Sequence, residues 1–481
     1  MNGVASTVLE RGGAGSRAAR RREARRAGAG AGAGATAVAA AAAAWLAAGG
    51  AGGCGAPFPK DDPEAVLEEG RLYVADASFR RHVLETSLVG DDNDWARARL
   101  ASWALPDGTG WDALPEMTTP TEPVRLADVN RLAAGEPLEM DGTATPLFDG
   151  AYPDSWWDLS ALGLRAFYEF PVRIEPVLEW ILADPARVAD YGLAVAADGV
   201  VVGVRKYPAP DGSVRVVEAC ALCHGSVDAD GRLLHGLPNT RLDLGRAWAD
   251  WIDEVSDAPD AEGEARLRSW GPGRVDVTPG ADDDPLQVPP LTGLRDTPFL
   301  HQTGTVRHDQ ASALAMRIET LMITSWVGAF RPPRTVAFAA AAWIYDLDPP
   351  IEPDAAALAG RMHGARVFRT AGCSDCHEPR VAYSAPWLVG ADVVGTDPAS
   401  ALTPSRGTGG YRVTPLRGVW AYAPYLHDGT VATLEDLFDA RRVEAGWTRG
   451  VRGPGPVPGH RYGLGLTPAE RADLLAFLRS L

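Results

Sequence analysis

Short stretches with apolar residues at helical spacing recur along the chain. Apolar residues fall at every third or fourth position in five of them, residues 76–88, 94–105, 175–183, 336–347 and 468–481. A further helix is expected at 354–368. The 38 prolines and 53 glycines indicate long loops between helices of modest length. The chain is therefore predicted to be mainly α.

β-structure is predicted at one place in the first half. Two valine-rich runs, 200–207 and 213–217, flank Asp211-Gly212 and form a hairpin signal. The region that ends there, residues 64–215, is predicted to be loop-rich and mostly helical. Its aromatic cluster at 152–157 is expected to pack in the core of this region rather than on a cofactor edge.

The second half of the chain contains an internal repeat. Residues 290–294 (PLTGL) and 298–301 (PFLH) return, with one residue gapped, as 415–419 (PLRGV) and 424–427 (PYLH). One of the predicted helices, 336–347 or 468–481, follows each copy. The repeat therefore predicts two tandem domains, residues 216–350 and 351–481.

Four of the five cysteines lie in two C-x-x-C-H motifs. This spacing is the attachment site of a c-type haem, in which the thiols form thioethers and the adjacent imidazole binds the iron. A zinc or disulfide pair is the alternative, but zinc would want a second cysteine or histidine pair for each metal. We therefore expect two covalently bound haem c groups, on Cys220, Cys223 and His224, and on Cys373, Cys376 and His377.

The first residues have the order of zones found in secretory signals. Seven arginines against two glutamates within residues 1–53, an apolar run at 35–48 and small residues lead to the fifth cysteine, Cys54. That run is short for a membrane span, which needs about 20 residues. We expect a signal peptide at 1–53, a lipid-bearing Cys54 and a tether at 54–63. Soluble periplasmic protein and uncleaved anchor are the alternatives, and all three predict a periplasmic or cell-envelope location.

The formal net charge of −17 limits the range of partners. Such a surface repels nucleic acid. It suits a basic redox protein through electrostatic steering. We expect a small redox protein or a quinol-chain donor as partner, and membrane contact only through the lipid anchor.

The chain resembles the bacterial di-haem cytochrome c peroxidase superfamily, which includes the methylamine-dehydrogenase-maturing di-haem enzyme and the haem rubber oxygenases. The two C-x-x-C-H motifs carry the resemblance, together with residues 414–438 (TPLRGVWAYAPYLHDGTVATLEDLF) and the ending from Gly459 to Leu481. It covers residues 215–481. An inter-domain Ca²⁺ is an open question for such proteins, but the sequence does not support one.

The resemblance implies candidates for the sixth ligand of each iron. In peroxidases of this superfamily, a Met that follows the His-Asp-Gly motif is the sixth ligand of the C-terminal haem. This chain has no Met after Met362. For the second haem, His460 is the leading candidate, His427 is second, and a different or absent ligand remains open. For the first haem the candidates are His235, His301, His308, Met316 and an open iron, which alone binds peroxide or O₂.

Two functions from different classes remain open at this stage. One is a peroxidase-like enzyme that reduces peroxide at the first haem and relays electrons through the second. The other is a non-catalytic periplasmic electron-transfer cytochrome with both irons closed. A rubber-oxygenase-like dioxygenase is a third reading, for which the sequence has no discriminating motif.

Overall fold

The computed structural model describes residues 60–90, 92–256, 260–276, 285–352 and 358–481. The expected signal peptide, Cys54 and most of the expected tether lie outside these residues. Residues Gly55–Val275 and Asp284–Leu481 form one compact unit. Within the described part of the chain, no helix combines the length and the apolarity that crossing a membrane requires.

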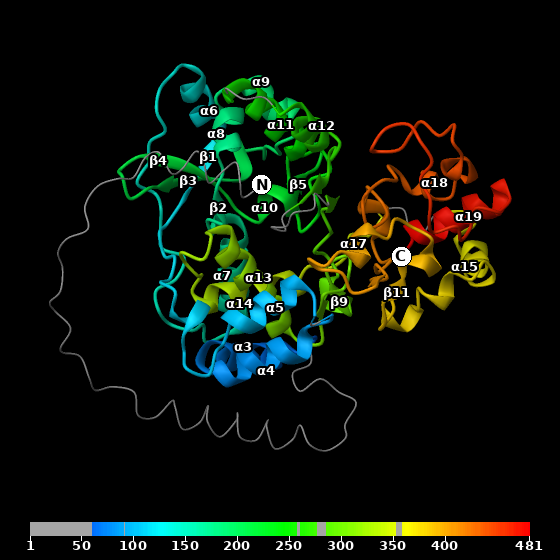
Figure 1. Cartoon of the computed structure of the whole chain (residues 1–481), viewed down its shortest axis with the longest axis horizontal. Helices are drawn as coiled ribbons and strands as arrows, with labels where there is room; N and C mark the ends of the chain where they lie inside the picture. Colours follow the sequence, from blue (N-terminus) through cyan, green and yellow to red (C-terminus); the bar gives the residue numbers. More distant parts are fainter. Residues whose placement is uncertain (1–59, 91, 257–259, 277–284, 353–357) are drawn as a thin grey trace. The chain divides into compact units, whose positions relative to one another are not determined.

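Three helices begin the described chain: α3 (Pro63–Ala75), α4 (Ala77–Ser87) and α5 (Asp94–Ser102) (Figure 1). Each follows an Asp or Asn whose side chain accepts hydrogen bonds from the first backbone N–H groups of the helix. The helices predicted at 76–88 and 94–105 are thus confirmed, while α3 was not predicted. Its fully buried Glu69 accepts hydrogen bonds from the backbone N–H groups of Ala311 and Ser312.

Three further helices form the core beside them: α7 (Trp156–Glu169), α13 (Ala311–Ser325) and α14 (Arg334–Tyr345). Helix α14 packs against both α7 and α13. The approach to α7 is close, since a Cβ at Gly163 would lie 2.0 Å from the carbonyl oxygen of Ala339. The prediction of a buried aromatic cluster is wrong for Trp157, which is 77% exposed. The reason is that it starts a helix whose opposite face fills the core.

A four-stranded antiparallel sheet precedes the first C-x-x-C-H motif, in the order β1 (Glu122–Arg125), β3 (Val200–Pro208), β4 (Val214–Glu218) and β2 (Arg173–Ile174). The β3–β4 pair confirms the predicted hairpin. Helices α8 (Pro176–Leu182) and α11 (Leu244–Val255) share its apolar core. Helices from both sides of residue 215 therefore pack together with this sheet and with α14, and the domain boundary at 215/216 stays a prediction.

The C-terminal part is built on the crossing of α15 (Arg361–Thr370) and α19 (Pro468–Arg479) (Figure 1). A Cβ at Gly364 would lie 1.9 Å from the carbonyl oxygen of Asp473, so glycine allows this close approach. A capping box at Thr467 and Glu470 starts α19. The predicted helix at 468–481 is confirmed. The one at 354–368 begins only at Arg361, and residues 353–357 are outside the described chain.

The remaining helices and strands are short. The helices are α6 (Leu126–Ala133), α9 (Pro185–Asp190), α12 (Ala261–Arg268), α16 (Ala391–Val394), α17 (Ala399–Leu402) and α18 (Leu434–Leu437). The strands are β7 (Arg274–Val275), β8 (Leu286–Gln287), β9 (Phe299–Leu300), β10 (Val306–Arg307), β11 (Val389–Gly390) and β12 (Gly410–Tyr411). The fold is mainly helical, with small sheets, as the sequence predicted.

Candidate haem sites

The first C-x-x-C-H motif forms a single tight turn against the sheet. It follows β4 as α10 (Ala221–His224), and β5 (Gly225–Val227) then pairs with β6 (Leu233–His235). Gly203 on β3 lies against this turn with a φ of +71°, and a Cβ there would lie 1.9 Å from the backbone nitrogen of Leu222. The sheet thus fixes the position of both thiols and of His224 through a contact that only glycine permits.

His224 is oriented by the carbonyl of the residue immediately before the first copy of the repeat. Its Nδ1 lies 3.0 Å from the carbonyl oxygen of Pro289, which leaves Nε2 for a metal. The His224 side chain is half-buried. Burial lowers the pKa of His224 to about 4, so the ring is neutral and its free nitrogen can bind iron.

The second motif has the same arrangement in the C-terminal part. Cys373–Asp375 form one 3₁₀ turn after α15, and His377 Nδ1 lies 2.8 Å from the carbonyl oxygen of Tyr383. Burial lowers the pKa of His377, and hydrogen bonding to the backbone of Tyr383 and Thr414 partly offsets this. Its ring is therefore neutral as well, with Nε2 left for a metal.

The sequence repeat explains this likeness. Pro289 and Thr414 are the residues immediately before the two copies, and each supplies backbone to the histidine of its own motif. Gly293 and Gly418 take the same left-handed backbone, with φ of +67° and +72°, where a Cβ would collide with Pro349 and Pro350 respectively. The backbone next to each copy of the repeat thus contacts the histidine of the corresponding C-x-x-C-H motif.

A large cavity lies at the second motif. It encloses about 1390 Å³ of empty space, counting the part open to solvent. Its wall contains the whole second attachment group and two further predicted ligands, namely Cys373, Cys376, His377, His427 and His460. Most other wall residues are apolar, among them Phe368, Phe438, Leu474 and Leu478. A flat, apolar group such as haem fits this cavity in size and chemistry.

Two imidazoles face each other in this cavity. The ring centres of His377 and His460 are 6.4 Å apart, with an angle of 66° between the planes. An imidazole nitrogen binds a metal at about 2 Å and lies roughly 1 Å from its ring centre, so two imidazoles on opposite sides of one iron have centres about 6 Å apart. The observed spacing therefore fits an iron between the two rings.

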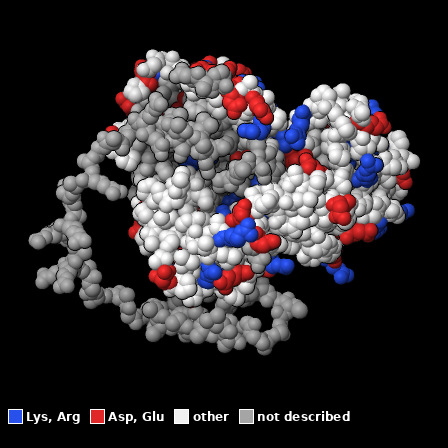
Figure 2. Space-filling view, viewed as in Figure 1, with Lys and Arg blue, Asp and Glu red and all other residues white. Residues whose placement is uncertain are grey.

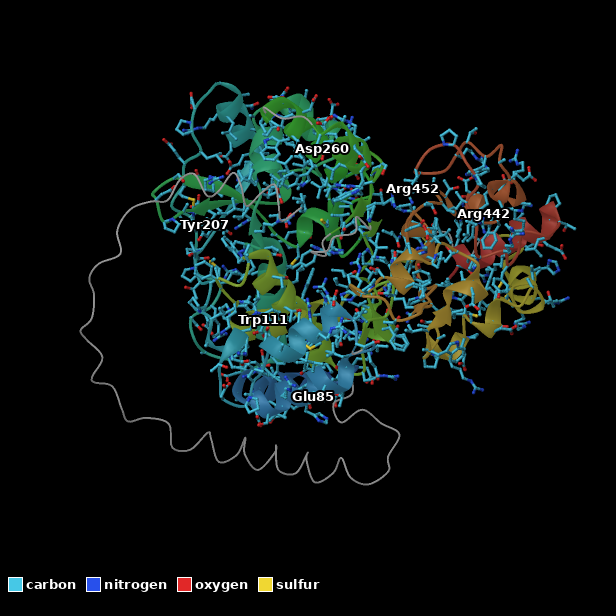
Figure 3. All side chains as sticks on the ribbon, in the orientation of Figure 1. Glu85, Trp111, Tyr207, Asp260, Arg442 and Arg452 are labelled. Carbon is cyan, nitrogen blue, oxygen red and sulfur yellow. The ribbon has the colours of Figure 1, made fainter. Side chains whose placement is uncertain are left out.

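Arg442 holds the loop that carries His460 (Figure 3). This fully buried guanidinium donates hydrogen bonds to four carbonyl oxygens, those of Leu437, Val457, Gly459 and His460, at 2.7 to 3.0 Å. The backbone of His460 has a positive φ of 44°, which the loop must support. Arg442 also stands in the region where the resembling peroxidases carry their Met ligand.

The other candidate ligands have different surroundings. His427 stacks on Tyr411, with ring centres 4.1 Å apart. His235 is exposed, and its Nδ1 lies 2.7 Å from the hydroxyl of Tyr168. Both nitrogens of His308 are engaged, by Thr297 and Tyr345.

His301 and Met316 complete the set. Both ring nitrogens of His301 are also engaged, one by Thr305 and the other by the Nε–H of Arg317. Met316 is fully buried in α13. Neither His308 nor His301 therefore has a ring nitrogen free to bind a metal in this arrangement. The assignment of His235 as a sixth ligand of the first haem stays a prediction.

The two sites are joined by adjacent residues. Pro289 contacts His224 through its carbonyl, and the next residue, Pro290, lies in the wall of the second cavity. Gln287 and Gln302 lie in that wall too, and Gln302 Nε2 donates to Gln287 Oε1 at 3.3 Å. One segment of the first tandem region thus contributes to both sites.

No separate metal centre is found in the described chain: nowhere in it do three or more His, Cys, Asp or Glu side chains come together in a way that could hold a metal ion. Ligands for the expected irons would be single histidines opposite a haem, which do not form such a group.

Comparisons with known proteins agree with this reading. Residues 410–448 match the family described as RoxA-like, cytochrome c-like. No curated protein matches the chain. Residues 410–448 are thus similar to a cytochrome c-like domain, which agrees with the resemblance to the bacterial di-haem cytochrome c peroxidase superfamily and with haem as the expected cofactor.

Two solved structures are similar to parts of the chain. A MauG-like protein associated with microbial copper homeostasis is 21% identical, with 43% of this chain and 77% of that chain covered and a TM-score of 0.31. Kuenenia stuttgartiensis hydrazine synthase is 15% identical, with 75% of this chain and 93% of that chain covered and a TM-score of 0.34.

Sequence reasoning missed three residues that shape the sites. Pro289 and Thr414 act through backbone groups, which no side-chain motif reveals, although their place before each repeat copy was a usable signal. Arg442 is the third. Its role depends on a loop conformation that the sequence does not encode in any recognisable pattern.

Proposed function

We propose that this protein carries two haem c groups and reduces peroxide at the first, while the second passes electrons to it. The observation that carries the proposal is the contrast between the two sites. His377 has a second imidazole opposite it at 6.4 Å. Among the described residues, His224 makes no ring contact with another histidine. An iron with two histidine ligands suits electron transfer, and an iron with one leaves a position for substrate.

The chain's own residues have distinct tasks in this proposal. His224 and His377 would hold the irons through Nε2, and the carbonyls of Pro289 and Tyr383 fix the orientation of the two rings. His460, held by Arg442, closes the second iron against small ligands. A haem iron with one open position supplies the site at which peroxide or O₂ binds. The adjacent residues Pro289 and Pro290 provide a short covalent connection between the sites.

A spectroscopic experiment on the full-length holoprotein tests the proposal. We expect one high-spin and one low-spin ferric signal in electron paramagnetic resonance, and CO binding to one of two haems after reduction. Two low-spin haems that ignore peroxide, cyanide and CO would overturn the enzyme and leave the electron-transfer cytochrome. Mass spectrometry of the holoprotein checks the number of haems.

A matched pair of variants assigns the reactive site. Cys220→Ser with Cys223→Ser removes the first attachment, and Cys373→Ser with Cys376→Ser removes the second. We expect CO binding to be lost in the first variant and retained in the second. The reverse result would assign substrate binding to the second haem and contradict the proposal.

We further propose export and a small redox protein or quinol-chain donor as partner. The support for export is the arrangement of residues 1–54, with which the expected haem c attachment agrees. For the partner, Figure 2 shows acidic and basic side chains interspersed on the visible face, and the sequence has an overall acidic excess. A salt-dependent rate of electron uptake from a basic cytochrome would support this partner.

A further inference from the structure

Three arginine side chains converge on His301 from separate parts of the chain. Arg317, on α13, donates its Nε–H to Nε2 of His301. Arg99, on α5, lies 3.5 Å from the centre of the Trp95 ring, and that ring meets His301 edge-on at 5.3 Å. Arg412 follows β12, and its backbone nitrogen donates to the carbonyl oxygen of Gln302, the neighbour of His301.

In this arginine cluster (Arg99, Arg317 and Arg412), Arg99 and Arg412 are buried, Arg317 is half-buried, and no carboxylate of the described chain compensates the charges. Within the described chain none of the three arginines forms an ion pair with a carboxylate. The Nε atoms of Arg99 and Arg412 are buried, and no described residue accepts a hydrogen bond from them. Burying like charges together is strongly unfavourable unless an anion compensates them.

The charges act on one another across the cluster. The pKa of His301 lies well below its usual value, because of burial and then because of Arg317, Arg406, Arg99 and Arg412. Burial, followed by Arg317, lowers the pKa of Arg99 to about 8. Burial lowers the pKa of Arg412 to about 10. These shifts are those of cations that have been enclosed before their partner is present.

The location of the cluster indicates which anion belongs there. Arg412 lies in the wall of the cavity that holds His377 and His460. Arg317 interacts electrostatically with the first attachment site: burial raises the pKa of Cys220 and lowers that of His224, and the charge of Arg317 opposes the first shift and adds to the second. Haem brings two carboxylates of its own, and guanidinium groups bind carboxylates in a bidentate manner.

We propose that the arginine cluster binds the haem carboxylates of both sites, with Arg412 serving the second haem and Arg317 the first, and Arg99 adding charge to both. This inference rests on the proposed presence of two haems. Positive charge next to a haem favours the ferrous over the ferric state. The cluster therefore raises both reduction potentials and offsets the loss of the Met ligand that the chain lacks.

Spectroelectrochemical titration of full-length holoprotein tests the proposal without an activity assay. We expect Arg412→Gln to lower the equilibrium constant for reduction of the second haem at least tenfold. This corresponds to a fall of its reduction potential by about 59 mV for one electron. Arg317→Gln should have the same effect on the first haem. Arg417→Gln, which removes an exposed arginine paired with Asp296, is the matched control and should leave both potentials unchanged.

Charge-retaining variants keep the test decisive if a glutamine variant does not fold. Arg412→Lys should keep the equilibrium constant for reduction of the second haem within threefold of its value in the unaltered protein. Resonance Raman of this variant should show a shift of the carboxylate bending band of that haem. An unchanged potential of the second haem in Arg412→Gln would overturn the proposal. So would a tenfold fall of the equilibrium constant for reduction in Arg412→Lys as well as in Arg412→Gln.

A free anion is the other source of a carboxylate or similar group. Titration of the unaltered protein with inorganic phosphate and with acetate should change neither potential nor either haem spectrum. A saturable shift would place a free anion at the arginines and overturn the haem assignment. Because potentials are measured whether or not an iron binds CO, failure here is distinct from failure of the peroxidase proposal.

Discussion

The two C-x-x-C-H sites share one side and differ on the other. In both, a backbone carbonyl lies at hydrogen-bond distance from Nδ1 of the motif histidine, that of Pro289 at the first site and that of Tyr383 at the second. His460 lies opposite His377, whereas Arg317, which is bound to His301, acts electrostatically on His224. Repetition has thus preserved the attachment side, and the features that distinguish the sites come from segments outside the repeat.

The variant expected to change this difference between the sites most is His460→Ala. Removing the second imidazole should convert the second haem from low spin to high spin and allow it to bind CO, which makes the two sites alike. Electron paramagnetic resonance and CO titration measure the change. His363→Ala is the control, because His363 lies in the same region but is exposed and paired with Asp473. A low-spin second haem in His460→Ala would refute the assignment.

Gly203→Ala should affect the first site alone. The new Cβ would meet the backbone of Leu222 at 1.9 Å, so the C-x-x-C-H turn must shift from the sheet. We expect a loss of about 2–4 kcal/mol in unfolding free energy and incomplete haem attachment at Cys220 and Cys223. Gly199→Ala controls for backbone strain, since Gly199 has a φ of +81° but open space around it. Equal haem content in both variants would contradict the argument.

Arg442→Gln should affect only the second site, and less severely. Its loss removes the hydrogen bonds that hold the carbonyls of Gly459 and His460, which costs about 3 kcal/mol. The second haem should then show a mixture of low-spin and high-spin signals. Arg441→Gln, at an exposed neighbour, should change neither. Should Arg442→Gln stay fully low-spin and equally stable, the loop does not depend on Arg442.

The smallest effect concerns pH and the helix that carries Arg317. Burial raises the pKa of Glu69 to about 7, although two backbone N–H groups of α13 partly offset this. A raised folded pKa gives stability that is complete below about pH 4.5 and is lost as pH rises from there through about 7. Glu69→Gln should abolish this decline. Hydrogen exchange in α13, compared with α19 as control, measures it, and an unchanged pH profile would contradict it.

Most of the fold could be predicted because its signals are local. The helices at α4, α5, α8, α14 and α19 and the β3–β4 hairpin follow from apolar spacing, caps and turn residues within each segment. Helix α3 and the exposed position of Trp157 could not be predicted, since both depend on which face α14 and α13 cover. The attachment residues were evident from spacing, whereas the spacing of His377 and His460 arises from a loop 83 residues later in the chain.

The position of Pro290 in the wall of the second cavity has a consequence for modularity. A polypeptide that began after residue 350 would contain the second motif, His427 and His460, but would lack Pro290, Gln287 and Gln302. Its cofactor pocket would be open on one side. The part of the chain after residue 350 is therefore not a unit that gene fusion or domain exchange can move alone with its pocket intact.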